Sequence, residues 1–122
     1  MSLVTCLAFA VYMESKSEPI KGQEAVAEVI LNRSRSDKYP NDVCSVIKQR
    51  GQFSWYNGRK NLNRKPQGSN DAQWQTALSV AKTTLDGKTN HTRGSLFFNT
   101  TNLGVRYKTK NKACKIGNHL FY

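Results

Sequence analysis

The sequence predicts one α+β domain that is mostly helical and ends in a small hairpin. Apolar residues recur at helical spacing over the first 35 residues and again between Trp74 and Leu85. After Thr89 the helical period is lost, and short apolar runs flank a Gly-Asn pair near the C-terminus. The chain has 122 residues, 38% of them hydrophobic, which suits one domain with one core. We therefore expect residues 1–122 to form a single domain.

Two helices are expected before residue 36. The first spans about residues 2–13 or slightly more, with one apolar stripe made by Leu3, Leu7 and Val11. Pro19 marks a turn over residues 17–21. The second helix spans about residues 22–35, with Glu24 and Glu28 on its polar side.

The middle of the chain predicts two helices separated by a long loop. Asn41 or Asp42 can cap a short helix over residues 43–49. Residues 51–68 read as an irregular loop, and such loops often bind ligands. Asn70 or Asp71 can cap the next helix, which Gly87 ends. We expect its apolar stripe to be core: Trp74, Ala77, Leu78, Ala81 and Leu85.

The last third of the chain predicts short strands. Residues 96–98 are a strand-like apolar run. Residues 114–116 and 119–122 can pair as a hairpin through Gly117 and Asn118.

Glu14 is the candidate catalytic residue. It continues the stripe of Leu7 and Val11, so its carboxylate is expected to be partly desolvated. Desolvation favours the neutral acid, and an acid that keeps its proton near neutral pH can act as a general acid. The alternative is a surface glutamate where the helix emerges from the core.

The segment around Glu14 resembles the opening of the SleB-type cell-wall hydrolases, which are peptidoglycan-cleaving glycosidases. That family opens with Glu-x-x-x-Glu-Pro, here Glu14 to Glu18-Pro19, and continues with a Gly, here Gly22. An Ala-Val-Ala helix ending in Asn-Arg follows, here residues 25–33. Residues 15–17 are Ser-Lys-Ser where typical members have Ala-Arg-Gly, which makes the placement of Glu18 less certain than that of Glu14.

Three later segments match the family in order. They are Pro40 with Val43, residues 46–47 and Gln52-Phe53-Ser54, then Gly94 to Asn99, then the ending Ile116 to Tyr122. The resemblance implies a lysozyme-like, lytic-transglycosylase-like fold. It also implies cleavage of peptidoglycan glycan strands between N-acetylmuramic acid and N-acetylglucosamine.

The resemblance assigns the acid to Glu14, and the sequence offers no obvious second carboxylate. Lytic transglycosylases use one Glu as acid and then base, and the muramyl 6-hydroxyl attacks to give a 1,6-anhydro product. We therefore expect a lytic transglycosylase, with a hydrolytic muramidase or glucosaminidase as the alternative. Glu18 either raises the pKa of Glu14 by like-charge repulsion or pairs with an Arg.

Further substrate-binding residues are expected from the family motifs and the adjacent loop. Ser54 could hydrogen-bond Glu14 or the substrate acetamido group, unless Phe53 simply packs in the core and Gln52 ends a turn. Tyr56 could stack on a sugar face. Asn99 could hold substrate, and His119 could support the site from behind. No cofactor and no metal site are expected, because the Cys and His spacings match no zinc motif.

The charge predicts an anionic partner. The net charge is +11, and residues 106–115 carry five cations and no acid. We expect anionic envelope polymers to attract the chain, and the alternative is a basic nucleic-acid-binding module. No nucleic-acid-binding motif supports that alternative, and a wall-binding relative without activity is a third hypothesis.

The cysteines and the first apolar segment bear on where the protein is made. Cys6, Cys44 and Cys114 are an odd number, Cys6 reads as a core residue, and we expect no dependence on a disulfide. Residues 3–13 lack the features of a signal peptide and are too short to span a membrane. We expect a monomeric phage endolysin, made in the bacterial cytoplasm and released to the wall.

Overall fold

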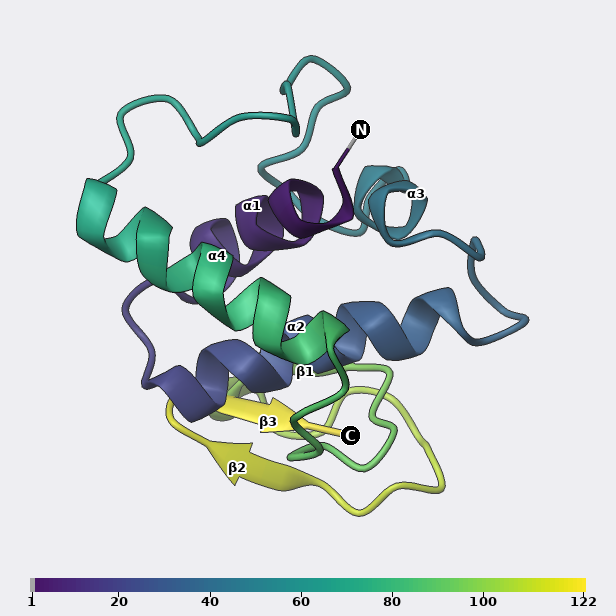
Figure 1. The fold of residues 1–122 in the computed structure, drawn as a ribbon. Helices are drawn as coiled ribbons and strands as arrows, with labels where there is room; N and C mark the ends of the chain where they lie inside the picture. The colour runs from purple at the N-terminus through teal and green to yellow at the C-terminus, as the bar shows by residue number, and fades with distance from the viewer. Residues whose placement is uncertain (1) are drawn as a thin grey trace.

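The computed structural model describes residues 2–122. Four helices are stacked over a small sheet: α1 (Leu3–Ser15), α2 (Ile20–Ser34), α3 (Val43–Lys48) and α4 (Asp71–Leu85). The strands are β1 (Phe98–Thr100), β2 (Cys114–Ile116) and β3 (His119–Phe121), and a 3-10 turn, η1 (Thr101–Leu103), follows β1. In Figure 1, α2 separates α1 and α4 from the sheet. The predicted α+β class, dominated by helices, is confirmed.

Helix α1 is the centre of the core. Ser2 caps it by accepting a hydrogen bond from the Thr5 N–H. Residues 6–12 are all buried, so the helix is apolar all round and packs against α2, α3 and α4. The predicted stripe is therefore only part of the buried surface, and its first member, Leu3, is 47% exposed.

The other helices follow their expected signals closely. Asn70 caps α4 through the Gln73 N–H, and Asp42 caps α3 through the Ser45 N–H. Helix α2 begins at Ile20, right after Pro19, so Gly22 lies inside the helix and does not open it. A Cβ at Gly22 would lie 3.4 Å from Glu18 and 3.8 Å from Ile116, which is ordinary van der Waals contact, so α2 lies close to β2 here.

The sheet has the order β1-β3-β2 and is antiparallel throughout. The predicted hairpin is confirmed as β2 and β3 joined at Gly117 and Asn118. The apolar run at residues 96–98 enters β1 only at Phe98, but the Leu96 and Phe97 N–H groups both donate to the Tyr122 carbonyl. The sequence did not indicate this third strand's pairing.

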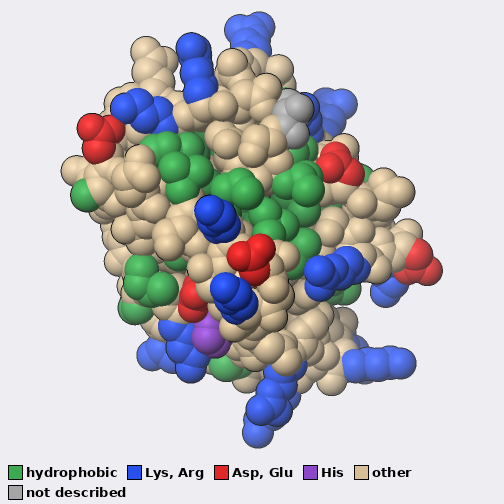
Figure 2. All heavy atoms as spheres, viewed as in Figure 1, with side chains coloured by type: hydrophobic (Ala, Val, Ile, Leu, Met, Phe, Trp, Pro, Cys, Tyr) green, Lys and Arg blue, Asp and Glu red, His purple; other side chains and the backbone are tan. Residues whose placement is uncertain are grey.

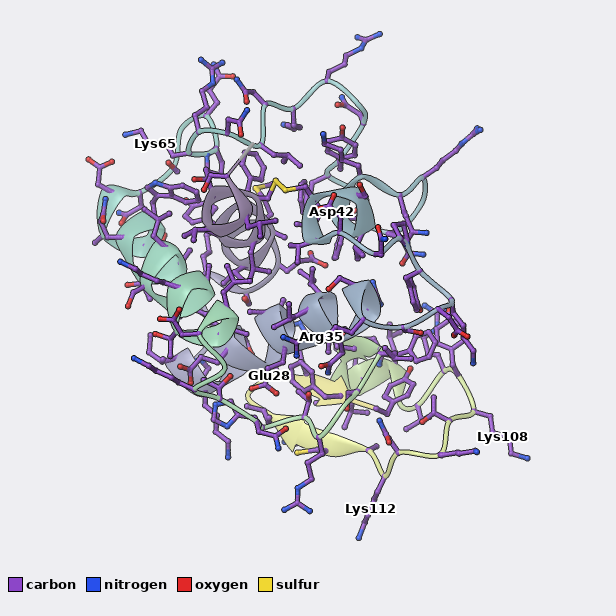
Figure 3. The ribbon with its side chains drawn as sticks, turned by 45° about the vertical axis from the view of Figure 1, so that its right-hand side comes forward. Glu28, Arg35, Asp42, Lys65, Lys108 and Lys112 are labelled. Carbon is purple, nitrogen blue, oxygen red and sulfur yellow. A yellow bond between two sulfur atoms is a disulfide. The ribbon has the colours of Figure 1, made fainter. Side chains whose placement is uncertain are left out.

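A disulfide corrects the expectation for the cysteines. Cys6 on α1 and Cys44 on α3 are bonded, with Cα atoms 5.6 Å apart, and Cys114 is free. Figure 3 shows the sulfur bridge between the two helices. Cys6 is buried as predicted from its apolar helix, and Cys44 is buried too, so the fold brings the two sulfur atoms within bonding distance. Sequence spacing alone could not reveal that approach.

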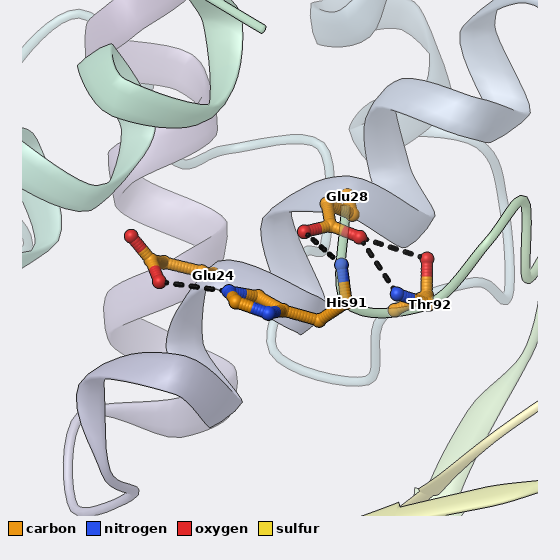
Figure 4. A network of polar contacts seen from close by, with 4 residues as sticks. All are labelled: Glu24, Glu28, His91 and Thr92. Carbon is orange, nitrogen blue, oxygen red and sulfur yellow. Dashed lines mark hydrogen bonds and ion pairs between the residues drawn. The ribbon is translucent and has the colours of Figure 1, made fainter. Parts of the chain in front are cut away.

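A second correction concerns the acids of α2. Glu28 is 5% exposed, not on a polar surface, and its carboxylate accepts bonds from the backbone N–H groups of His91 and Thr92 and from the Thr92 hydroxyl. Glu24 contacts His91 Nε2 at 2.9 Å (Figure 4). Burial alone would raise the pKa of Glu28, but the hydrogen bonds from His91 and Thr92 lower it overall. These contacts fasten the loop after α4 onto α2.

Within residues 2–122, no helix is both long and apolar enough to cross a bilayer.

Candidate active site

Glu14 lies in the last turn of α1, where the helix leaves the core. It is half-buried, and this burial raises its pKa above the ordinary value of 4.5. The Trp55 indole and the Arg33 guanidinium act in the opposite direction and reduce the shift, without reversing it. Glu14 is thus partly desolvated, as its place on the apolar stripe predicted, and its role as the acid stays a prediction.

Trp55 supplies the apolar wall around this carboxylate. Its ring stacks on Phe53 at a centroid distance of 5.4 Å and contacts Phe9 at 5.5 Å. Its indole N–H is buried and lies close enough to Glu14 to lower that pKa, although the contact falls short of standard hydrogen-bond geometry. A donor beside a half-buried carboxylate can steady the ionised form after the proton has left.

Arg33 connects Glu14 to the far wall of the site. Its Nε donates to the Leu96 carbonyl at 2.8 Å and its Nη1 to Gln52 Oε1 at 3.2 Å, while the guanidinium lies over the Tyr39 ring. The side chain is buried, and this lowers its pKa, while the charges of Tyr39 and Glu14 oppose the change. The cation is thus fixed by three segments of the chain.

Two hollows adjoin this arrangement. One, of about 370 Å³, is lined by nine residues: Arg33, Tyr39, Gly51, Gln52, Phe97, Phe98, Asn99, Arg106 and Tyr107. The other, of about 180 Å³, is lined by residues 13–18 and contains Glu14 and Glu18. Arg33 lines the first hollow and acts on the acid in the second, so the two are linked electrostatically.

Comparison with known proteins identifies the chain. The sequence profile of the family described as Cell Wall Hydrolase matches residues 17–122. This chain belongs to the cell wall hydrolase family. The match begins three residues after Glu14, so it covers the hydrolase fold but not the proposed acid itself.

Individual relatives agree with the family. The spore cortex-lytic enzyme of Bacillus subtilis is 52% identical over 44 residues, which are 36% of this chain and 14% of that enzyme. The Bacillus cereus enzyme is 54% identical over 44 residues, 17% of its length. The chain thus matches only a small part of these curated relatives. The catalytic domain of the germination-specific lytic transglycosylase SleB from Bacillus anthracis has a similar fold, with TM-score 0.72 and 30% identity over 97% of this chain and 91% of that domain.

The second glutamate of this cell wall hydrolase is bound to the hairpin. Glu18 Oε1 accepts from the Asn118 backbone N–H at 2.7 Å, and Oε2 accepts from Asn118 Nδ2 at 3.1 Å. His119 Nδ1 is 3.7 Å from Oε1. Among residues 2–122 no Arg pairs with Glu18, and Glu18 is not among the groups that shift the pKa of Glu14. The observed contacts tie the turn after α1 to the turn between β2 and β3.

Two predicted residues line the larger hollow. Gln52 does so while accepting from Arg33. Asn99 lines it too, but its amide group is occupied: Nδ2 donates to the Gly104 carbonyl at 2.8 Å, and Oδ1 accepts from the Tyr122 hydroxyl. The same hydroxyl accepts from the Arg106 N–H at 2.8 Å. Asn99 therefore holds the loop that carries Arg106, and direct substrate binding by Asn99 stays a prediction.

The remaining predicted residues lie around the site and not inside either hollow. Phe53 is buried and its ring stacks on Trp55, in agreement with the alternative that Phe53 packs in the core. Ser54 is exposed, and no hydrogen bond joins it to Glu14. Tyr56 is half-buried against Trp55. His119 is buried against Phe98, and burial lowers its pKa while Glu18 opposes the change.

Several residues at the site carried no sequence signal strong enough to single them out. In the sequence, Arg33 stood out only as the last residue of a helix motif. The structure shows that it is buried, and a buried Arg needs hydrogen-bond partners or a counter-charge, which marks it as a candidate site residue. Tyr107 is 53% exposed, stacks on Phe97 at 4.8 Å and lines the larger hollow. It lies in an irregular segment without periodicity, so only the fold places it beside Arg33.

Proposed function

We propose that this chain cleaves the glycan strands of peptidoglycan between N-acetylmuramic acid and N-acetylglucosamine, as a lytic transglycosylase. The observation that carries the proposal is Glu14, a half-buried acid with a raised pKa beside Trp55 and Arg33. Membership of the cell wall hydrolase family supports the substrate class, and similarity to a domain described as a lytic transglycosylase supports the reaction.

The reaction needs one carboxyl group in two roles. Protonated Glu14 donates its proton to the glycosidic oxygen as the bond from C1 to that oxygen breaks, which leaves an oxocarbenium-like centre at C1. The carboxylate so formed then removes the proton from the muramyl 6-hydroxyl, and O6 attacks C1. The new C1–O6 bond closes a 1,6-anhydro ring, and Glu14 has its proton again. No water is consumed.

The lack of a free second carboxylate favours this route over hydrolysis. Glu18 is the only other acid lining the two hollows, and both of its oxygens accept bonds from Asn118. A nucleophile or base that directs water would need an unengaged oxygen facing the substrate. Hydrolysis remains the second candidate, because Glu18 lines the same small hollow as Glu14.

Mass spectrometry of the muropeptides released from purified peptidoglycan tests the proposal. We expect 1,6-anhydro-muramyl ends, lighter than hydrolytic products by one water, and loss of release in Glu14→Gln. Asp37→Asn removes an equal charge from an exposed position and should leave release unchanged. Reducing ends would support hydrolysis instead, and normal release by Glu14→Gln would contradict the assignment of the acid.

The setting we propose is lysis by a phage endolysin that acts as a monomer. The protein would be made in the host cytoplasm and would reach the wall only after the membrane is permeabilised. In support, residues 3–13 form the core of α1, so their removal as a leader would destroy the site. Expression in a bacterial cytoplasm should cause lysis only when a membrane-permeabilising protein is co-expressed. Lysis without that protein would contradict this route.

A further inference from the structure

One large hollow on the described surface is lined by neither Glu14 nor Arg33. It has a volume of about 670 Å³ and lies between Lys38 and the segment 108–111, over a floor that includes Phe97 and Tyr122. A second hollow of about 470 Å³ continues past it, with Arg93 and Lys112 on its rim. Lys110 and Asn111 line both, so the two hollows are neighbours that share a wall, and together they are here called the basic cradle.

The cradle carries one sign of charge. Its lining includes five exposed cations, Lys38, Arg93, Lys108, Lys110 and Lys112, and no Asp or Glu. Two acids beside the second hollow are already engaged: Glu24 contacts His91, and Glu28 accepts from His91 and Thr92. Asp37 is exposed next to Lys38 but does not line the cradle. Figure 3 shows Lys108 and Lys112 projecting outward from this part of the chain. A concave surface of one sign concentrates an oppositely charged ligand.

Arg93 adds an independent observation. Its φ is +52°, and it is the one non-glycine residue within 2–122 with a positive φ. Such a backbone conformation costs an L side chain about 1 kcal/mol, and glycine would avoid the cost. The contacts of Glu28 with Thr92 hold the preceding residue in place. Arg93 thus places a cation on the cradle at a position where the backbone conformation favours glycine.

The cradle is continuous with the candidate active site. Phe97 lines both the larger cradle hollow and the hollow beside Arg33. Tyr107 stacks on Phe97 at 4.8 Å and precedes Lys108 directly. A wall polymer held in the cradle would therefore lie next to the hollow that Arg33 lines.

We propose that the basic cradle binds the phosphodiester polymers of the bacterial wall and tethers the enzyme beside its glycan substrate. A phosphodiester chain carries a charge at each repeat, so successive phosphates can meet cations in both hollows at once. Lysine ammonium groups suit phosphate as point charges. A single stem carboxylate could contact only one of them. The choice of a wall polymer as the ligand rests on the proposed function. The position of the binding site rests on the residues of the cradle alone.

Co-sedimentation with purified wall sacculi tests this site. The full chain with Glu14→Gln is used, so that bound walls are not degraded. Neutralising two central cations, K108Q/K110Q, should weaken binding about tenfold at low salt and reduce the salt slope by about two. The matched control K48Q/K82Q removes the same charge from exposed positions on α3 and α4 and should bind within about twofold of the parent.

Two comparisons identify the ligand. Walls stripped of phosphodiesters by hydrofluoric acid should bind the parent about tenfold more weakly, and K108Q/K110Q should then differ little from it. Arg93→Gly should weaken binding while the thermal midpoint stays the same or rises. Equal losses in K108Q/K110Q and K48Q/K82Q would overturn the site. Undiminished binding to stripped walls would overturn the ligand, as would single-stranded DNA displacing the protein at far lower phosphate concentration than poly(glycerol phosphate).

Failure here is distinguishable from failure of the proposed function. With Glu14 intact, K108Q/K110Q should release muropeptides from phosphate-free peptidoglycan at the parent rate. Normal release together with unchanged retention on walls would overturn the cradle alone. Binding to walls without any Glu14-dependent release would overturn the proposed activity and leave the cradle in place.

Discussion

Burial of Glu14 has two opposite consequences, one for proton donation and one for stability. Its burial raises the pKa of the carboxyl, which suits a proton donor, but it also makes the ionised form costly in the folded chain. The first step of the proposed reaction uses the protonated acid, so activity should fall as pH rises through this raised pKa. A pH profile of muropeptide release should therefore have its alkaline limb above 4.5, the ordinary value for Glu. A limb at or below that value would contradict the role.

The same burial predicts that Glu14→Gln stabilises the protein near neutral pH. A pKa raised by folding means that the folded chain binds the proton more tightly than the unfolded chain. Stability is therefore lost as pH rises through the folded pKa. The substitution removes this loss, so its thermal midpoint should exceed the parent's at pH 7 and not at pH 4. Equal differences at both pH values, measured by calorimetry, would show that burial of the charge is not the cause.

At the scale of secondary-structure elements, Glu18 ties the turn after α1 to the turn between β2 and β3 through Asn118, next to Gly117. Gly117 has φ +59°, and a Cβ there would lie 2.5 Å from Glu18 Oε1. Gly117→Ala should therefore destabilise the protein through both backbone strain and the clash. Glu18→Ala should cost about 1 kcal/mol, because it removes two hydrogen bonds whose Asn118 donors are exposed and can turn to water.

A double-mutant cycle separates these effects. In the Glu18→Ala background the clash with the carboxylate is gone, so Gly117→Ala should cost less than it does in the parent, leaving the cost of positive φ and of the close approach to Pro19 Cδ at 3.2 Å. The measurement is the free energy of unfolding in urea for all four proteins. Strict additivity would mean that the contact is not formed in solution.

The disulfide between Cys6 and Cys44 is expected to stabilise the packing of α1 against α3. It joins α1 to α3 across 38 residues of sequence, and a loop of that length corresponds to about 4 kcal/mol of unfolded-state entropy. Cys44→Ala should lower the free energy of unfolding by up to that amount. A reducing agent should lower the thermal midpoint of the parent but not of Cys44→Ala. Identical midpoints of the parent with and without reductant would show that the bond is absent.

The whole molecule carries a net charge of +11, with cations spread around the face drawn in Figure 2. Mutual repulsion of these cations destabilises the compact state, and salt screens it. Raising the salt from about 10 to about 200 mM should therefore raise the thermal midpoint, while the same change weakens retention on walls. A midpoint that falls with salt would mean that attractive ion pairs outweigh the repulsion.

The sequence determined much of the fold at this scale. Helical periodicity and the capping residues Asp42 and Asn70 predicted the helices to within a few residues, and Gly117-Asn118 predicted the hairpin. These features are local, because a cap or a period is written in neighbouring residues. Glu14 was accessible for the same reason, since it continues an apolar stripe along one helix.

What the tertiary structure decided were the contacts between residues far apart in the chain. The pairing of Cys6 with Cys44, the burial of Glu28 against residues 91–92 and the binding of Glu18 by Asn118 each join segments at least 38 residues apart. No local pattern encodes such approaches, because each depends on how whole elements pack. The position of Arg33 beside Glu14 and the continuity of the basic cradle with the site have the same origin: charges set by the sequence acquire a function only where the fold brings them together.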